Sequence, residues 1–164
     1  MKPTVTVIMP VYNVEKYVGF AIESIISQTF EDFKLLIIDD ASTDHTLEVI
    51  NQYHDKRIEL IKNHTNIGIA NSLNRGLSLA NSPYIARMDG DDLCDPTRFE
   101  KQVKFLDEHP EYAIVSTPML YFDENNIRGD VMYNIRQEQI KAYIEQNNAV
   151  SIKQLRALLP DVSL

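Results

Sequence analysis

Residues 35–40 have the sequence LLIIDD, in which four consecutive apolar residues precede two aspartates. A short apolar run without alternation is typical of a strand that is buried on both faces, the pattern of parallel sheets covered by helices. Similar runs at residues 5–9, 58–61 and 84–88 alternate with segments whose apolar residues recur at helical spacing. This order predicts an α/β fold with a mostly parallel sheet, flanked by helices and joined by right-handed crossovers.

The segments between these strands predict helices. Residues 18–26 and 69–80 have the clearest helical spacing, and Gly76 is a weak point in the second of them. Ser42 or Thr43 is expected to cap a further helix.

The last clear helix is expected to start at Asp95, acting as N-cap, with Pro96 in the first helical position and a stop before Pro110. Residues 112–116 predict a fifth strand. The pattern is weaker after residue 118, where we expect a hairpin of residues 119–122 and 131–135, a helix at 137–146 and a short helix at 151–159. The last segment ends without an evident structural reason, so a truncation at the C-terminus is expected.

The composition excludes several classes of protein. The chain has 164 residues, enough for one domain with a buried core, and no run approaches the roughly 20 apolar residues of a membrane helix. Its formal net charge of −8 argues against nucleic acid, whose phosphates are neutralised by Lys and Arg. Cys94 is the only cysteine, so no internal disulfide can form. We expect a cytoplasmic location; peripheral association with the inner face of the membrane and a homo-oligomer are left open.

Polar clusters follow each of the first four predicted strands. In chain order they are Tyr12 and Asn13; Asp39, Asp40, Ser42 and Asp44; Asn63, His64 and Asn66; and Asp89, Asp91 and Asp92. Because ligands bind outside the carboxyl ends of the strands in open parallel sheets, these clusters are expected to meet at one edge.

The strongest single feature is the motif DGDD at residues 89–92. At ~4 Å and an effective dielectric of ~20, each close pair of carboxylates costs about 4 kcal/mol. A divalent cation would remove that cost, since Mg²⁺ typically takes one or two protein carboxylates and completes its shell with water and substrate phosphates. Gly90 would let the backbone approach a ligand. A solvated acidic turn before a helix explains the motif equally well when it is taken alone.

Other polar residues divide into binding and structural candidates. Asp40 lies at the mouth of a buried strand, where its carboxylate can accept a hydrogen bond from a base N–H. Tyr12 offers a flat face for stacking, although a turn aromatic is an equal alternative. Ser42, Thr43 and Asp44 are interpreted as helix caps, His64 as a solvated loop residue and Cys94 as a packed thiol. The spacing of the five glycines and four histidines excludes a dinucleotide fingerprint, a P-loop and a zinc site.

Three motifs in this order resemble the inverting family 2 glycosyltransferases of the GT-A fold: VIMPVYN at residues 7–13, IDDASTD at 38–44 and RMDGDD at 87–92. Residues 28–30, 66–68 and 74–76 are also similar to that family. The resemblance covers about residues 4 to 117 and is specific because the motifs occur together at this spacing.

The resemblance implies roles for particular residues. Those expected to bind the nucleotide-sugar are Pro10, Tyr12, Asn13, Asp39, Asp40, Asn74, Asp89 and Gly90. Asp89 and Asp91 would form the DxD motif, with Asp91 the position most expected to touch Mn²⁺ or Mg²⁺, which would stabilise the departing diphosphate. In the family a downstream carboxylate deprotonates the acceptor hydroxyl. Asp123, Glu124 and Asp130 match no such motif, so no catalytic base is named.

The implied function is metal-dependent transfer of a sugar, with inversion, from a nucleotide diphosphate donor to a glycan or lipid-linked acceptor in cell-surface polysaccharide synthesis. A UDP-sugar is the expected donor and a dTDP-sugar the second choice. Residues 1–117 would bind the donor, and residues 118–164 would be a partial acceptor-side segment. Two alternatives remain: a non-catalytic or truncated nucleotide-sugar binding module, and a nucleotidyltransferase, which would be expected to carry a Gly- and basic-rich loop where this chain has Val11-Tyr12-Asn13.

Overall fold

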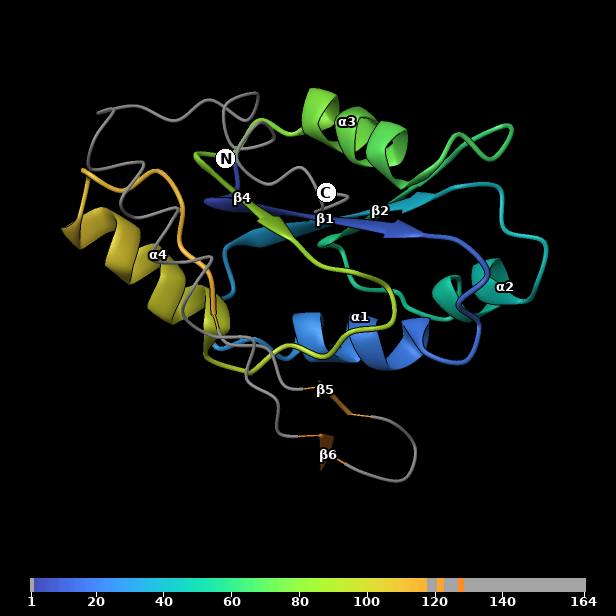
Figure 1. Ribbon diagram of the computed structural model, residues 1–164, viewed down its shortest axis with the longest axis horizontal. Helices are drawn as coiled ribbons and strands as arrows, with labels where there is room; N and C mark the ends of the chain where they lie inside the picture. Colours follow the sequence, from blue (N-terminus) through green and yellow to red (C-terminus); the bar gives the residue numbers. More distant parts are fainter. Residues whose placement is uncertain (1, 118–120, 123–126, 129–164) are drawn as a thin grey trace. The chain divides into compact units, whose positions relative to one another are not determined.

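A four-stranded parallel sheet forms the centre of the fold (Figure 1). The computed structural model describes residues 2–117, 121–122 and 127–128. The strands are β1 (Val5–Val11), β2 (Phe33–Asp39), β3 (Ile58–Lys62) and β4 (Tyr84–Arg87). They pair in the order β3-β2-β1-β4, and every pairing is parallel. The predicted α/β class with a mostly parallel sheet is confirmed.

The two central strands carry much of the core. β1 and β2 pair along seven residues each, and every residue of β1 is buried, as expected for a strand covered on both faces. Pro10 lies inside β1, although proline cannot donate a hydrogen bond to a neighbouring strand. β4 pairs with β1 only as far as Ile8, so at Pro10 the strand has β2 as its one strand neighbour among the described residues.

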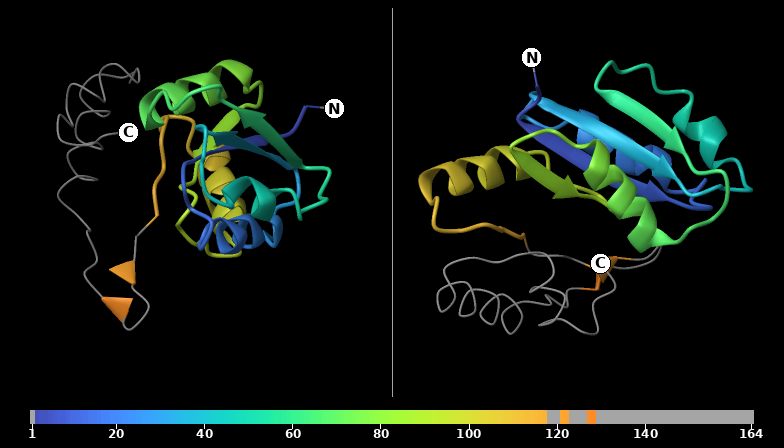
Figure 2. Two further views of the ribbon diagram at one scale, coloured as in Figure 1. Left: turned by 90° about the vertical axis from the view of Figure 1, so that its right-hand side faces the viewer. Right: turned by 90° about the horizontal axis from the view of Figure 1, so that it is seen from above.

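Within the described residues, four helices confirm the helical segments predicted before residue 110. Their bounds are α1 (Val18–Ile26), α2 (Thr46–Ile50), α3 (Ile69–Leu79) and α4 (Arg98–Glu108). The views in Figures 1 and 2 show α3 on one face of the sheet and α1 and α2 on the other. The sheet is thus covered on both sides, which explains why its central strands tolerate unbroken apolar runs.

The two predicted helix caps have different outcomes. The carboxylate of Asp95 accepts the backbone N–H of Thr97 at 2.9 Å, as expected of a capping residue, but α4 begins at Arg98, so the prediction of Pro96 in the first helical position is wrong by two residues. α2 instead begins after His45, without a side-chain hydrogen bond at its cap. The prediction that Ser42 or Thr43 caps α2 is wrong, because both residues bond to the loop after β1.

The predicted fifth strand at residues 112–116 is also wrong, since this segment is irregular. Its side chains are mostly exposed, with Ile114 at 40%. A strand needs a neighbour for its backbone hydrogen bonds, and the apolar run alone does not supply one. The expected hairpin has a partial counterpart, because β5 (Tyr121–Phe122) pairs antiparallel with β6 (Ile127–Arg128). The return strand expected at 131–135 and the helices expected at 137–146 and 151–159 lie outside the described residues.

The chain divides into two compact units, one reaching to Glu100 and one beginning at Lys101. The boundary at 117/118 between a donor and an acceptor segment stays a prediction. Within the described residues, no helix combines the length and apolar character needed to span a bilayer.

Gly76 faces the sheet from the middle of α3. A Cβ atom added there would lie 2.4 Å from Cγ2 of Ile8, which is 1% exposed in β1. The residue interpreted from sequence as a weak point in the helix therefore permits close packing of α3 on the sheet. In Gly76→Ala, overpacking is expected to lower the free energy of unfolding by about 1–3 kcal/mol. The higher helix propensity of alanine opposes this loss by roughly 1 kcal/mol.

Urea unfolding of the purified chain measures this effect. Asn74→Ala is the matched control, because it introduces the same residue on the exposed side of α3. We expect the control to leave stability unchanged or slightly raised. Equal stabilities of the two variants would contradict the packing argument.

Candidate functional site

The loops that follow the four strands lie at the carboxyl edge of the sheet. β2 and β3 lie to one side of β1 and β4 lies to the other, so the winding of the chain reverses between β1 and β4. In open α/β sheets ligands bind outside the carboxyl ends of the strands at such a reversal. The predicted meeting of the polar clusters at one edge is confirmed, with Tyr12 and Asp89 following neighbouring strands.

The loop after β1 is bonded to the loop after β2. Asn13 donates its backbone N–H to Oγ of Ser42 at 3.1 Å, and its Oδ1 accepts the N–H of Thr43 at 2.8 Å. Glu15 donates its N–H to Oδ2 of Asp44 at 3.1 Å. These contacts hold the two loops together as one wall of the carboxyl edge.

Two residues of this wall have left-handed backbone conformations. The φ angle is 52° at Asn13 and 61° at Ala41. Asparagine tolerates this region better than alanine, for which such a conformation costs of order 1–3 kcal/mol. The hydrogen bonds between the two loops hold these residues in their unfavourable conformations. Residues held in this way cluster at functional sites.

Asp40 anchors the loop after β3. It is 3% exposed; its Oδ1 accepts hydrogen bonds from Nδ2 of Asn63 at 2.7 Å and from the N–H of Ile67 at 2.9 Å, and its Oδ2 accepts the N–H of Gly68 at 2.8 Å. Burial raises the pKa of Asp40, but these bonds and one from Ser72 outweigh it and hold the pKa below 3.8. The residue predicted to accept a base N–H is charged at neutral pH, and it already accepts protein donors.

The contacts of Asp40 continue onto α3. Nδ2 of Asn63 also donates to Oγ of Ser72 at 2.9 Å, while Nη1 of Arg75 donates to Oδ1 of Asn63 and to the carbonyl of Lys62, the latter at 2.9 Å. The sequence analysis did not identify Ser72, and it placed Arg75 only in a region of family similarity. Their spacing of three residues on a predicted helix was the available signal, because such residues lie on the same side of a helix.

The other predicted binding residues have varied environments. Asp39 is 1% exposed, and its Oδ1 accepts the N–H of Ser42 at 3.3 Å, so it supports the loop after β2. Tyr12 is 46% exposed beyond β1, whereas Pro10 is buried within the strand. Asn74 is exposed on α3. Their roles in binding stay predictions.

The DGDD motif lies against the end of β1. A Cβ atom added to Gly90 would lie 2.7 Å from Cγ1 of Val11, so glycine permits this approach. The motif also contains an ion pair, since Nε and Nη2 of Arg87 donate to the two carboxylate oxygens of Asp89 at 3.0 and 2.9 Å. The charge argument from sequence overlooked Arg87, although residues two apart at the end of a strand lie on the same side. The positive charge of Arg87 therefore compensates the negative charge of Asp89 without a metal ion.

The other two carboxylates of the motif are exposed. Among the described residues, none hydrogen-bonds to the carboxylate of Asp91. Loss of solvation raises the pKa of Asp92, and the charges of Asp89 and Asp91 raise it further. A region of negative potential therefore remains beside the switch point, in spite of Arg87.

Buried polar contacts behind the motif fix the loop that follows it. Gln28 is 4% exposed; its Nε2 donates to the carbonyl of Asp95 at 2.6 Å and its Oε1 accepts the N–H of Phe99 at 3.1 Å. Nη2 of Arg98 donates to the carbonyl of Arg87 at 3.1 Å. Sequence analysis placed Gln28 only in a region of family similarity and did not identify Arg98.

Two structural interpretations from the sequence are confirmed. Cys94 is 7% exposed, and burial raises the pKa of its thiol, as expected for a packed residue rather than a nucleophile. His64 is exposed in the loop after β3.

The carboxylates of the motif fit a hard divalent cation in the chemistry of their donors. Among the described residues, no group of three or more His, Cys, Asp or Glu side chains could hold a metal ion by itself. Mg²⁺ commonly takes only one or two carboxylates and completes its octahedral shell with water and substrate phosphate oxygens. Asp91 could supply one such ligand, so the motif fits a metal held jointly with a diphosphate and does not fit a cage made by the protein alone.

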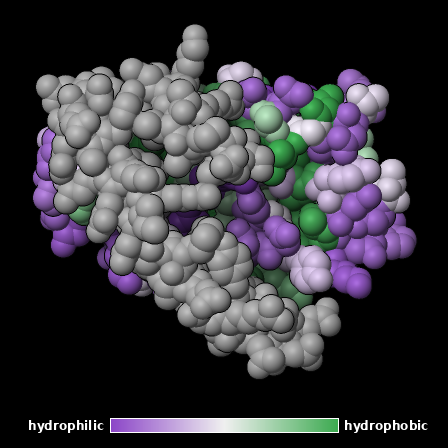
Figure 3. All heavy atoms as spheres, viewed as in Figure 1, coloured by the Kyte–Doolittle hydropathy of each residue, from purple (hydrophilic) through white to green (hydrophobic). Residues whose placement is uncertain are grey.

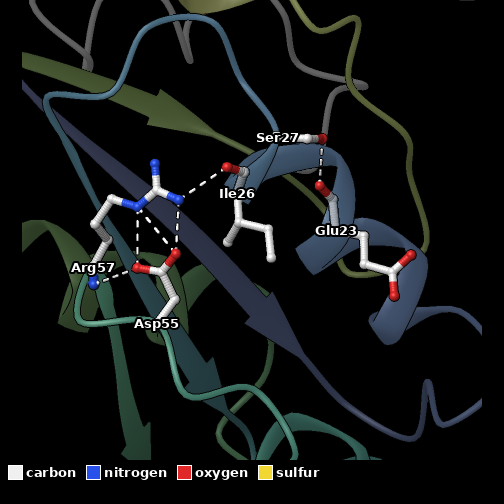
Figure 4. Close-up of polar contacts among 5 residues, drawn as sticks. All are labelled: Glu23, Ile26, Ser27, Asp55 and Arg57. Atoms are coloured by element: carbon white, nitrogen blue, oxygen red, sulfur yellow. Dashed lines mark hydrogen bonds and ion pairs between the residues drawn. The ribbon is translucent and has the colours of Figure 1, made fainter.

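A second polar region lies at the amino edge of the sheet, beside the start of β2. A hollow of about 820 Å³ there is lined by Glu31, Asp32, Phe33, His54, Asp55, Lys56 and Arg57. Figure 4 shows Nη2 of Arg57 donating to Oδ2 of Asp55 at 2.7 Å and to the carbonyl of Ile26 at 2.9 Å, at the end of α1. A cation there satisfies the last carbonyls of the helix, so these groups are structural.

On the face in Figure 3, apolar and hydrophilic residues intermix over the described part of the chain. Isolated exposed apolar residues are normal in soluble proteins.

The chain belongs to glycosyl transferase family 2, whose family model matches residues 6–162. EpsE of Bacillus subtilis strain 168, named as a glycosyltransferase, is 52% identical over 130 residues, which cover 77% of this chain and 47% of EpsE. The Escherichia coli protein WfaP, named as a UDP-Glc:alpha-D-GlcNAc-diphosphoundecaprenol beta-1,3-glucosyltransferase, is 37% identical over 103 residues, covering 63% of this chain and 41% of WfaP. The chain spans less than half the length of the curated relatives it matches.

Solved structures show the same fold. Residues 1–349 of TarS from S. aureus, in complex with UDP-GlcNAc, superimpose with a TM-score of 0.62 at 32% identity, covering 67% of this chain and 32% of that structure. The mannosyltransferase PcManGT from Pyrobaculum calidifontis, in complex with GDP-Man and Mn²⁺, has a TM-score of 0.59 at 26% identity, covering 65% and 33%. The sheet and its flanking helices are those of the GT-A fold, as the sequence resemblance predicted.

Proposed function

We propose that this chain is the donor-binding portion of a metal-dependent glycosyltransferase that uses a UDP-sugar. The observation that carries the proposal is the position of the DGDD motif, packed against the end of β1 beside the switch point of the sheet. The loops after β1 and β2 would take the base and ribose, and Asp91 would hold Mn²⁺ or Mg²⁺ against the diphosphate. TarS, a relative by structure, is described in complexes with UDP-GlcNAc and with UDP.

In the proposed reaction, the sugar passes with inversion to a glycan or lipid-linked acceptor in cell-surface polysaccharide synthesis. The bound cation would stabilise the charge that develops on the departing diphosphate. The name of WfaP includes a lipid-linked diphosphate acceptor, which supports the same class of acceptor here. The described residues leave the catalytic base unassigned, because Asp123, Glu124 and Asp130 lie outside them.

A non-catalytic nucleotide-sugar binding module is the second candidate, because the chain spans less than half the length of its curated relatives and no catalytic base is assigned. The nucleotidyltransferase interpretation is disfavoured, because family membership and the bonded loop after β1 both point to donor binding. Release of UDP from a UDP-sugar, measured with a cell-wall glycan or lipid-linked acceptor present, separates the two candidates. Turnover by the chain itself would exclude the binding module.

Calorimetric titration of UDP tests the donor site directly. We expect binding in the presence of Mn²⁺ that weakens at least tenfold when the metal is chelated, since a diphosphate then meets uncompensated carboxylates. Equal affinity with and without metal would contradict the proposed role of the cation. No binding in either condition would contradict the donor site.

A further inference from the structure

A line of polar contacts connects α3 with Asp40, and its outermost member is a cation. Nη1 of Arg75 donates to Oδ1 of Asn63, and Nδ2 of Asn63 donates to Oδ1 of Asp40 at 2.7 Å. Asn63 and Asp40 are 7% and 3% exposed, whereas Arg75 is partly exposed. An arginine can only donate and a carboxylate can only accept, so the amide between them has one permitted orientation. Arg75 holds the oxygen of Asn63 toward itself and the NH₂ group toward Asp40.

This arrangement leaves Asp40 one adaptable acceptor position. A carboxylate has about four lone-pair sites, and Asn63, Ile67 and Gly68 occupy three of them with donors fixed by the fold. Among the described residues no donor fixed by the fold occupies the fourth; the hydroxyl of Ser72, whose oxygen accepts Nδ2 of Asn63 at 2.9 Å, is nearby and can rotate. An incoming N–H can therefore bond to Asp40 without displacing a backbone donor, provided that Asn63 keeps the carboxylate in place.

We propose that Arg75, acting through Asn63, is a positioning residue that makes Asp40 select nucleotide bases presenting an N–H over bases presenting a lone pair. The inference rests on the proposed function, in which the base lies against the loops after β1 and β2. Uracil presents N3–H and bonds to the carboxylate. Cytosine presents a lone pair at N3, which would face the charge of Asp40 unpaired. A site built to hydrogen-bond a ligand group strongly rejects an analogue that lacks it.

The test compares UDP with CDP by calorimetry in the presence of Mn²⁺. We expect wild-type protein to bind UDP at least about tenfold more tightly than CDP, the effect of one buried unpaired group. Arg75→Met should reduce this preference about tenfold, mainly by weakening UDP. Arg75→Lys retains a cationic donor and should restore most of the preference. Lys104→Met, which removes an exposed cation from α4, is the matched control and should leave the ratio unchanged.

The ratio of the affinities for UDP and CDP separates a positioning role of Arg75 from effects that weaken the binding of both ligands. Any attraction of Arg75 for the diphosphate acts on both ligands, and any damage to the loop weakens both, so each of these effects cancels in the ratio of the two affinities. Equal weakening of UDP and CDP in Arg75→Met would overturn the inference and leave the donor site intact. Binding of neither ligand by wild-type protein would sink the proposed function as well. If Arg75→Met does not fold, as judged by circular dichroism, Arg75→Ala tests the same point, because it also leaves the oxygen of Asn63 without this donor, and the same loss of preference is expected.

Discussion

Asp91→Asn is expected to lower the affinity for UDP in the presence of Mn²⁺ at least about tenfold, as chelation of the metal does. Loss of a residue that only supports a metal ligand already costs about 10–100-fold, and Asp91 is proposed as a direct ligand. Asparagine retains the size of the side chain but removes the charge that a hard cation prefers. Because Asp91 is exposed, its replacement should leave the fold intact.

Calorimetric titration of UDP with Mn²⁺ and with chelator measures this loss. The variant should bind UDP with nearly the same weak affinity in both conditions. Glu108→Gln, which removes one exposed carboxylate from α4, is the control and should retain the metal dependence of the wild type. A metal dependence in Asp91→Asn as large as that of the wild type would show that Asp91 does not hold the cation.

Asp40→Asn is expected to lower the free energy of unfolding by about 2–4 kcal/mol at neutral pH. The carboxylate accepts charge-assisted hydrogen bonds from Asn63, Ile67 and Gly68 while 3% exposed. An asparagine there would direct an NH₂ group at one set of these donors, leaving buried polar groups unpaired. Urea unfolding followed by circular dichroism measures the loss. The control is Asp32→Asn, whose carboxylate is exposed and accepts bonds from Thr4 at a single oxygen that an amide oxygen can replace, so less than about 1 kcal/mol is expected.

The stability contributed by Asp40 should depend on pH in a defined direction. Its folded pKa lies below 3.8, whereas an unfolded aspartate titrates near 3.9. The contribution is therefore complete above about pH 5, one unit above the unfolded pKa, and is lost as the pH falls through the folded pKa. The difference in stability between wild type and Asp40→Asn should shrink between about pH 5 and pH 2. A difference that stays constant over this range would show that the charge of Asp40 does not stabilise the fold.

The strand and helix pattern follows from local chemistry. Unbroken apolar runs such as Leu35–Ile38 indicate burial on both faces, and parallel strands need crossover helices, so the α/β class could be predicted without coordinates. The same reasoning failed at residues 112–116, because a short apolar run does not reveal whether a neighbouring strand is available. It also failed at Ser42 and Thr43, whose partner loop is distant in sequence.

Features of the candidate site also divide into those that could be predicted from the sequence and those that could not. The carboxylates of DGDD and the residues at the strand ends could be identified from the chain, since parallel strands bring their carboxyl ends to one edge. The partners of those residues could not. Arg87 neutralises Asp89, and Arg75 reaches Asp40 through Asn63, by contacts that depend on which way each side chain points.

The periodicity of apolar residues was enough to establish a parallel sheet with its polar loops along one edge, because burial acts on each segment separately. Strand order, and with it the switch point between β1 and β4, comes from the packing of whole elements against one another. The charge state and free lone pairs of Asp40 likewise depend on donors contributed by other segments, since electrostatic interactions act between neighbours in space.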